Sequence, residues 1–141
     1  MVRRALLSLM VATLLAAGLQ APAEAAVASE EVHPEWGSTS APDAVLKRGC
    51  KNYTYSYQVT PPEGQWSLEL FFKGPRGKRV GSAYFLAGGD PQADTRSLEL
   101  CRSTTRPGRY TIKAFLSVQN LDETTEGWLP QSTFRLHRKR R

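Results

Sequence analysis

The chain has little of what catalytic sites are usually built from. It contains only two histidines, His33 and His137, among 141 residues. No Gly-x-Ser-x-Gly, His-Glu-x-x-His, Walker or dinucleotide-binding glycine pattern occurs in it, so serine hydrolases, zinc peptidases and nucleotide enzymes have no local support. Paired carboxylates would have to come from Glu69 and Glu99, which we expect on outward, solvated strand faces. The sequence therefore predicts a protein that is not an enzyme and has no cofactor and no catalytic residue.

Long apolar runs are also absent, apart from one near the start of the chain. Arg3 and Arg4 precede an uncharged stretch from Ala5 to Leu19, which is shorter than the roughly 20 residues that a membrane span needs. The alanine-rich stretch that follows fits a peptidase cleavage site. We therefore predict a bacterial-type signal peptide over residues 1–25, a secreted product, and no membrane span after cleavage.

Cysteine is as scarce as histidine, with Cys50 and Cys101 as its two examples. An exported protein meets an oxidising environment in which paired thiols persist, so we predict a Cys50–Cys101 disulfide. The alternation of the flanking residues puts both sulfurs off the core-facing side, which predicts a bridge at a strand end or edge. A nucleophilic cysteine or a metal-binding pair would need a nearby histidine or closer ligand spacing, so we expect no metal here.

From Ala44 onward, large apolar residues alternate with polar ones, which is the pattern of half-buried β-strands. The clearest example has Tyr53, Tyr55 and Tyr57 in phase with Val59. Core packing is the favoured interpretation of these tyrosines, and a sugar-stacking platform is the alternative. The expected strands are 52–59, 66–73, 79–86, 97–101, 110–118 and 132–137, with a possible short one at 45–48.

These segments define the fold class and the domain organisation. Six or seven strands with turns at this spacing predict an all-β protein, a single antiparallel β-sandwich that is immunoglobulin-like or jelly-roll-like, with one disulfide. The sandwich domain is expected over residues 44–137. Residues 26–43 are polar and rich in turn formers, so we expect a disordered tail there, and residues 138–141 form a basic tail.

Two turn motifs resemble those of secreted sandwiches. The run from Pro107 to Ile112 resembles the tyrosine corner of immunoglobulin-like domains, with Tyr110 as the corner residue and Ile112 where antibody domains carry a cysteine. Together with the turn at 74–77, the segment 66–110 is similar to bacterial pre-peptidase C-terminal domains. That resemblance implies a β-sandwich with a non-catalytic accessory role.

Three phenylalanines offer a candidate binding patch. By simple parity, Phe71, Phe85 and Phe115 each lie opposite the main apolar set of their strand. If all three face outward, they form an exposed apolar patch of the kind that marks a partner site. The alternative is a two-residue turn at Pro75 and Arg76, which pairs Trp66 with Phe85 and turns Phe85 inward.

Charged residues provide two further candidates. Arg138, Lys139, Arg140 and Arg141 at the C-terminus could attract an anionic cell-wall polymer, although a frayed, solvated tail is the plainer interpretation. Acidic residues in two loops could hold calcium, but their spacing is not that of an EF-hand, and solvated acids are the favoured interpretation. These loop residues are Asp90, Asp94, Asp122, Glu123 and Glu126.

The leading hypothesis is a secreted, non-catalytic binding or cell-surface-associated module. Its partner could be a cell-wall polymer, a glycan or a protein, and the sequence does not choose between them. Nucleic acid is not expected, because basic and aromatic residues are not interleaved on a recognisable nucleic-acid fold. The alternative is a secreted inhibitor of a protease or another enzyme, which would present the loop expected at Ala87–Thr95.

Overall fold

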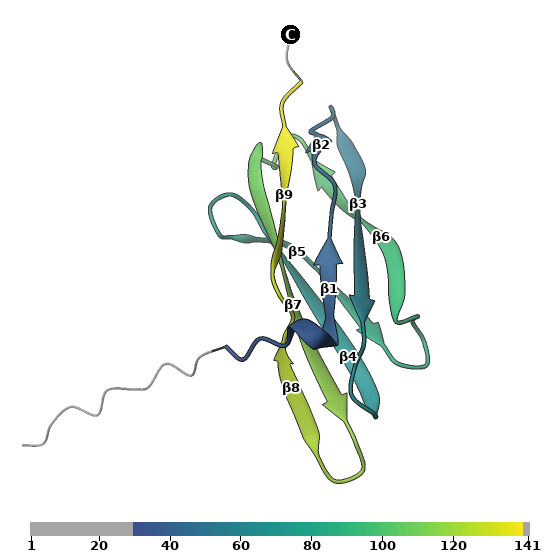
Figure 1. Ribbon diagram of the computed structural model, residues 1–141. Helices are drawn as coiled ribbons and strands as arrows, with labels where there is room; N and C mark the ends of the chain where they lie inside the picture. Colours follow the sequence, from purple (N-terminus) through teal and green to yellow (C-terminus); the bar gives the residue numbers. More distant parts are fainter. Residues whose placement is uncertain (1–29, 140–141) are drawn as a thin grey trace, which may run out of the picture.

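The computed structural model describes residues 30–139, which form two β-sheets packed face to face (Figure 1). This confirms the prediction of an all-β sandwich with one disulfide. No helix within the described residues is long and apolar enough to cross a membrane. The predicted signal peptide at 1–25 and the tail residues Arg140 and Arg141 lie outside the described residues. The elements are η1 (Pro34–Trp36), β1 (Gly37–Ser40), β2 (Ala44–Val45), β3 (Cys50–Val59), β4 (Gln65–Lys73), β5 (Arg79–Leu86), β6 (Ala93–Cys101), β7 (Gly108–Gln119), β8 (Thr124–Trp128) and β9 (Ser132–His137).

The strand order is that of an immunoglobulin-like sandwich. One sheet has the order β1-β3-β6, and the other has the order β2-β9-β7-β4-β5, with β8 also paired to β7. The strands β1, β3 and β6 correspond to A, B and E of the immunoglobulin fold, and β4, β7 and β9 correspond to C, F and G. The short strand β2 continues the first strand in the other sheet, where it pairs in parallel with β9.

The core is filled by the inward-facing residues of β3, β4 and β7. Tyr53, Tyr55, Tyr57 and Val59 are all buried, which confirms the interpretation of this face as core. The ring of Tyr55 meets Phe72 of the opposite sheet at a centroid distance of 4.7 Å. The largest fully buried side chains are Tyr110, Phe72, Leu46, Leu68, Leu70, Ile112, Leu116 and Leu136.

The segment before Ala44 is part of the sandwich, which corrects the prediction of a disordered tail for residues 30–43. Strand β1 pairs with β3 over four residues. Trp36 is only 7% exposed, and its ring is stacked on His33 at 3.6 Å. The reason is that an edge strand is held by backbone hydrogen bonds, which a polar Gly-Ser-Thr-Ser sequence makes as well as an apolar one. Residues 26–29 lie outside the described residues.

The tyrosine corner is present at the start of β7. The hydroxyl of Tyr110 donates a hydrogen bond to the backbone carbonyl of Arg106 at 2.5 Å, and the ring itself is buried. This bond ties the β6–β7 turn to the core strand that follows it.

Candidate functional site

The three candidate phenylalanines do not form one patch. Phe85 is 6% exposed and lies 4.3 Å from the ring of Tyr57 in the core. The expectation that it faces outward is therefore wrong. Phe85 does face inward, as the alternative with a two-residue turn predicted. Its partner in the ladder is Leu68, however, and not Trp66. The register differs because the connection between β4 and β5 is longer than two residues and follows a β-bulge at Phe72 and Lys73.

Phe71 and Phe115 are half-buried on the outer face of the larger sheet, and Trp128 lies between them. The Trp128 ring is 6.0 Å from Phe71 and 5.0 Å from Phe115. Cations cover these rings: Arg79 lies 4.6 Å over Phe71, and Lys113 lies 4.4 Å over Trp128. The aromatic faces are thus already occupied by partners from the same chain. Trp128 was missed because its strand has no apolar alternation.

The acidic residues of the β5–β6 region are used within the chain. Arg96 lies 3.3 Å from a carboxylate oxygen of Asp90 and 2.7 Å from one of Asp94. The other oxygen of Asp90 accepts a hydrogen bond from the backbone NH of Leu86. These carboxylates are therefore arranged around a guanidinium, and nothing in their geometry favours calcium.

The loop considered for an inhibitor is short and tied to the sandwich. Strand β6 begins at Ala93, so only residues 87–92 lie between β5 and β6. The backbone NH of Asp90 donates to the carbonyl of Leu86, and the hydroxyl of Tyr57 donates to the carbonyl of Pro91. The loop is held back against the sheet edge.

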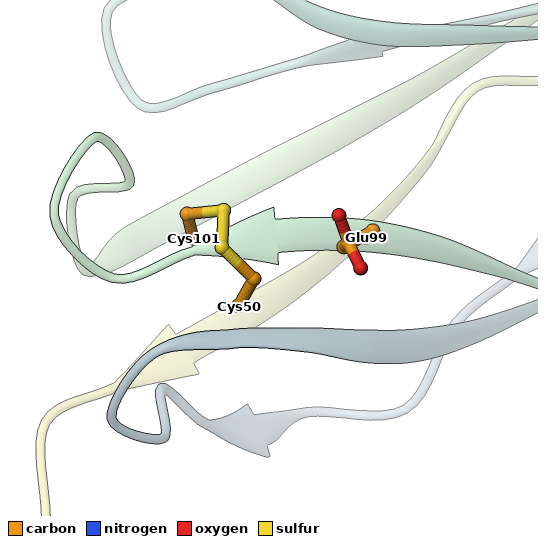
Figure 2. A group of neighbouring side chains, drawn as sticks. All are labelled: Cys50, Glu99 and Cys101. Carbon is orange, nitrogen blue, oxygen red and sulfur yellow. A yellow bond between two sulfur atoms is a disulfide. The ribbon is translucent and has the colours of Figure 1, made fainter.

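The disulfide joins the beginning of β3 to the end of β6 within one sheet. Cys50 and Cys101 are directly opposite each other in the ladder, with a Cα–Cα distance of 3.8 Å. As the alternation predicted, both side chains lie on the outer face and at the strand ends. Glu99 lies two positions before Cys101 in β6 (Figure 2), and its carboxylate forms a compact group with the two sulfurs. Because both sulfurs are in the disulfide, this group offers no thiolate to a metal.

The most distinctive surface is the end of the sandwich at which β4, β6 and β9 finish and β3, β5 and β7 begin, which we call the basic end. Among residues 30–139, every lysine and arginine except Arg96 and Lys113 lies there. Asp43 and Glu99 are the acids at this end. The cations of the basic end are Lys47, Arg48, Lys51, Lys73, Arg76, Lys78, Arg79, Arg102, Arg106, Arg109, Arg135, Arg138 and Lys139.

Acidic residues collect in the other half of the molecule, toward the end formed by the β7–β8 hairpin (Figure 1). They are Glu30, Glu31, Glu35, Glu63, Asp90, Asp94, Asp122, Glu123 and Glu126. The predicted basic tail residues Arg138 and Lys139 are exposed beyond β9, so they extend the basic end. The sandwich is therefore strongly polarised along its long axis.

The β-ladders at the basic end place like charges opposite each other. Lys73 of β4 is the direct partner of Arg79 in β5, and Arg109 of β7 is the direct partner of Arg135 in β9. Directly opposed like charges destabilise a sheet by up to about 1 kcal/mol per pair. The charge pattern therefore works against folding, which indicates that the cations have another use.

A cleft of about 240 Å³ opens at the basic end between the β4–β5 turn and the β6–β7 turn. Arg76, Lys78 and Arg79 line it from one turn, and Thr105 and Arg106 line it from the other. No Asp or Glu contributes to its lining. Its floor includes the buried ring of Tyr110.

Burial dominates the titration of three core tyrosines. It raises the pKa of Tyr55, Tyr57 and Tyr110 above the ordinary value of 10.0. For Tyr110, burial is the largest cause of this shift in pKa. At the acidic end, a backbone hydrogen bond and the neighbouring His33 lower the pKa of the exposed Glu35 carboxyl.

Comparison with known proteins assigns no family to the chain. No family model matches the chain, and no curated protein matches it. Among solved structures, it is similar to the CARDB domain of the PF1109 protein from Pyrococcus furiosus, which was crystallised in complex with di-metal ions. That similarity has a TM-score of 0.41 at 13% sequence identity and covers 74% of this chain and 97% of the other. The class of the protein is defined by its own strand order, as an immunoglobulin-like β-sandwich domain with one disulfide.

Proposed function

We propose that the protein is an exported, non-catalytic module that binds an anionic polymer at the cell surface through its basic end. The observation that carries this proposal is the polarisation of charge: the lysines and arginines of the described residues gather at one end. They do so although the ladder pairs Arg109 with Arg135. An anionic partner supplies the counter-charge that these pairs lack.

A polymer fits this surface better than a single small molecule. The cations belong to separate turns and strand ends around residues 47–51, 73–79, 102–109 and 135–139, so they spread over the whole end of the sandwich. A chain of anionic groups contacts several of them at once and releases several condensed counterions, which strengthens binding at low salt. The disulfide supports the extracellular part of the proposal, since it needs an oxidising compartment.

A binding role also suits the chemistry of this end. Its cleft is lined by guanidinium, ammonium and hydroxyl groups, which hold anions but provide no general base. His137, the histidine of this end, has its Nε2 3.8 Å from a carboxylate oxygen of Asp43, and neither residue lines the cleft.

Binding to a soluble glycerol phosphate polymer, measured by isothermal titration calorimetry at several salt concentrations, tests the proposal. We expect binding that weakens steeply as salt increases. Replacing Lys47, Arg48 and Lys51 by glutamine should weaken it by about tenfold or more at low salt and flatten the salt dependence, since each lost phosphate contact removes close to one unit from the slope.

The control has the same net charge but is altered at the opposite end. Replacing the exposed residues Gln119, Thr124 and Thr125 by glutamate also lowers the net charge by about three units. Because this change is far from the basic end, the loss of affinity should be at most a few fold once salt screens distant charges. Equal losses in the two variants, or no binding by the unaltered protein, would contradict the proposal.

A further inference from the structure

We propose that the cleft between the β4–β5 and β6–β7 turns is a subsite for one phosphate group of the anionic polymer. This inference rests on the proposed function and names the chemistry that the basic end recognises. Two arginines from different turns, Arg76 and Arg106, line the same cleft with Lys78 and Arg79. They are brought together only by the fold, since the two turns are separate in sequence.

The backbone that carries these cations is held in place before any ligand arrives. In the β4–β5 turn, the NH of Gly74 donates to the carbonyl of Lys78 at 2.8 Å, and the NH of Gly77 donates to the carbonyl of Gly74 at 2.8 Å. In the β6–β7 turn, the Tyr110 hydroxyl fixes the carbonyl of Arg106. A rigid frame reduces the entropy lost when the ligand binds.

The two turns are also in direct contact. A Cβ atom at Gly108 would lie 2.7 Å from Cγ of Pro75, and Gly108 has a φ of 143°, a conformation that favours glycine. The absence of a side chain at Gly108 lets the Pro75 turn approach the start of β7. This contact places the turn that carries Arg76 beside the start of β7, which directly follows the turn that carries Arg106.

The charges of the cleft are available for an external anion. Within residues 30–139, none of its four cations forms an ion pair with a carboxylate. By contrast, both cations outside the basic end are paired: Arg96 with Asp94 and Lys113 with Glu30. Arg76 and Arg106 line one space and have no carboxylate partner, and guanidinium groups match the several acceptor oxygens of a phosphate.

Other hollows on the molecule lack this combination. A depression of about 480 Å³ across β1, β3 and β6 is lined by serine hydroxyls and by Asp94, so it offers no cation. A wider one of about 750 Å³ beside β9 has Arg135, Arg138 and Lys139, but these follow one another along a single strand and its extension. Of these three hollows on residues 30–139, the cleft is the one that has cations from two turns around one space.

The test uses the intact secreted protein and glycerol 3-phosphate as the small probe, followed by amide chemical shifts in NMR spectra. We expect saturable shift changes in the two turns, at residues 74–79 and 102–107. The variant R76Q/R106Q should lose at least about tenfold in affinity for this probe, since each lost bond to a charged group corresponds to about one decade. The matched control Q119E/T125E lowers the net charge by the same two units at the opposite end of the sandwich, at exposed residues outside the binding surface, so it should stay within about twofold of the unaltered protein.

Several outcomes separate this inference from the proposed function. If the two double variants lose the probe equally, or if acetate produces the same shift changes as glycerol 3-phosphate, the phosphate subsite is refuted. If the polymer then still binds in a salt-dependent manner, the proposed function stands without it. If the unaltered protein binds neither probe nor polymer, both are refuted. Well-dispersed spectra of each variant establish that it is folded.

Discussion

Removing the disulfide should destabilise the sandwich by an amount that depends on salt. Cys50 and Cys101 are separated by 51 positions in the sequence. In the chain-entropy model, closing a loop of this length stabilises the folded state by about 4 kcal/mol. Domains of this size have a total stability of about 5–15 kcal/mol, so the variant C50A/C101A should fold but with a small margin. Its melting temperature should fall by about 15–25 °C.

The salt dependence follows from where the disulfide lies. It joins two chain regions rich in cations, around Lys51 and around Arg102. While the bond is intact, these regions stay close together even in the unfolded chain, so both states experience their repulsion. Without it, the unfolded chain relieves that repulsion and the folded state does not. Two unit charges about 10 Å apart in water repel by about 0.4 kcal/mol, and salt screens this over about 8 Å at physiological strength.

Urea denaturation followed by tryptophan fluorescence measures both effects. The free energy of unfolding should be about 4 kcal/mol lower for C50A/C101A than for the oxidised protein at low salt. Increasing sodium chloride to about 0.5 M should raise the stability of the variant by more than that of the oxidised protein. A loss below about 1 kcal/mol, or equal salt effects on the two proteins, would refute the reasoning.

Three further predictions concern the core, the turns and the pH dependence. Phe85→Ala should cost about 3–5 kcal/mol because Phe85 is buried, whereas Phe71→Ala should cost about 1 kcal/mol or less, as urea denaturation will show. Gly108→Ala should destabilise the domain by more than about 1 kcal/mol and shift the amide signals of the Pro75 turn, whereas unchanged signals there would contradict the contact. Because burial raises the pKa of Tyr110, the folded state keeps the hydroxyl proton to a higher pH than the unfolded chain does. The contribution of Tyr110 to the free energy of unfolding should therefore be constant below pH 10 and fall as the pH rises above it. A free energy of unfolding that increased between pH 10 and 11 in chemical denaturation would contradict this.

The alternation of large apolar residues with polar ones was sufficient to predict the strands that cross the middle of the core. The tyrosines of β3 and the apolar residues of β7 lie inward as the pattern indicated. The run from Pro107 to Ile112 also indicated the tyrosine corner through its resemblance to immunoglobulin-like domains, and the hydrogen bond from the Tyr110 hydroxyl to the Arg106 carbonyl is present. Both inferences depend on local sequence, which is why they could be made without coordinates.

Phe85 could not be placed in this way because the inner face of its strand is shaped by the opposite sheet. Gly81 and Ala83 share the inward face of β5 with Phe85, and they are small, so the outward residues Tyr84 and Leu86 look like the main apolar set. A Cβ atom at Gly81 would lie only 2.6 Å from a methyl group of Leu98. Leu98 of β6 fills the space that larger side chains of β5 would otherwise occupy.

The basic end was only partly predictable. The sequence drew attention to the C-terminal arginines, but the other cations are scattered over four turns or strand ends. In an antiparallel sandwich, every second connection returns to the same end. The strands expected from the sequence were therefore enough to predict that these cations gather at one end. What it did not contain is the contact between Pro75 and Gly108, which creates the cleft and depends on the packing of two turns.

The charge pattern and the disulfide account for each other. A sheet whose only requirement was stability would place an acid opposite Arg109 or Arg135, and the chain has enough acids to do so; yet most of them lie in the other half of the molecule. Beside these cations, a disulfide joins β3 to β6, and the buried Tyr110 fixes the adjoining turn. Both devices are located at the basic end. Under the proposed function, an anionic partner supplies the counter-charge for this surface, and the open cleft between the turns is where one anionic group can approach Arg76, Lys78, Arg79 and Arg106 together.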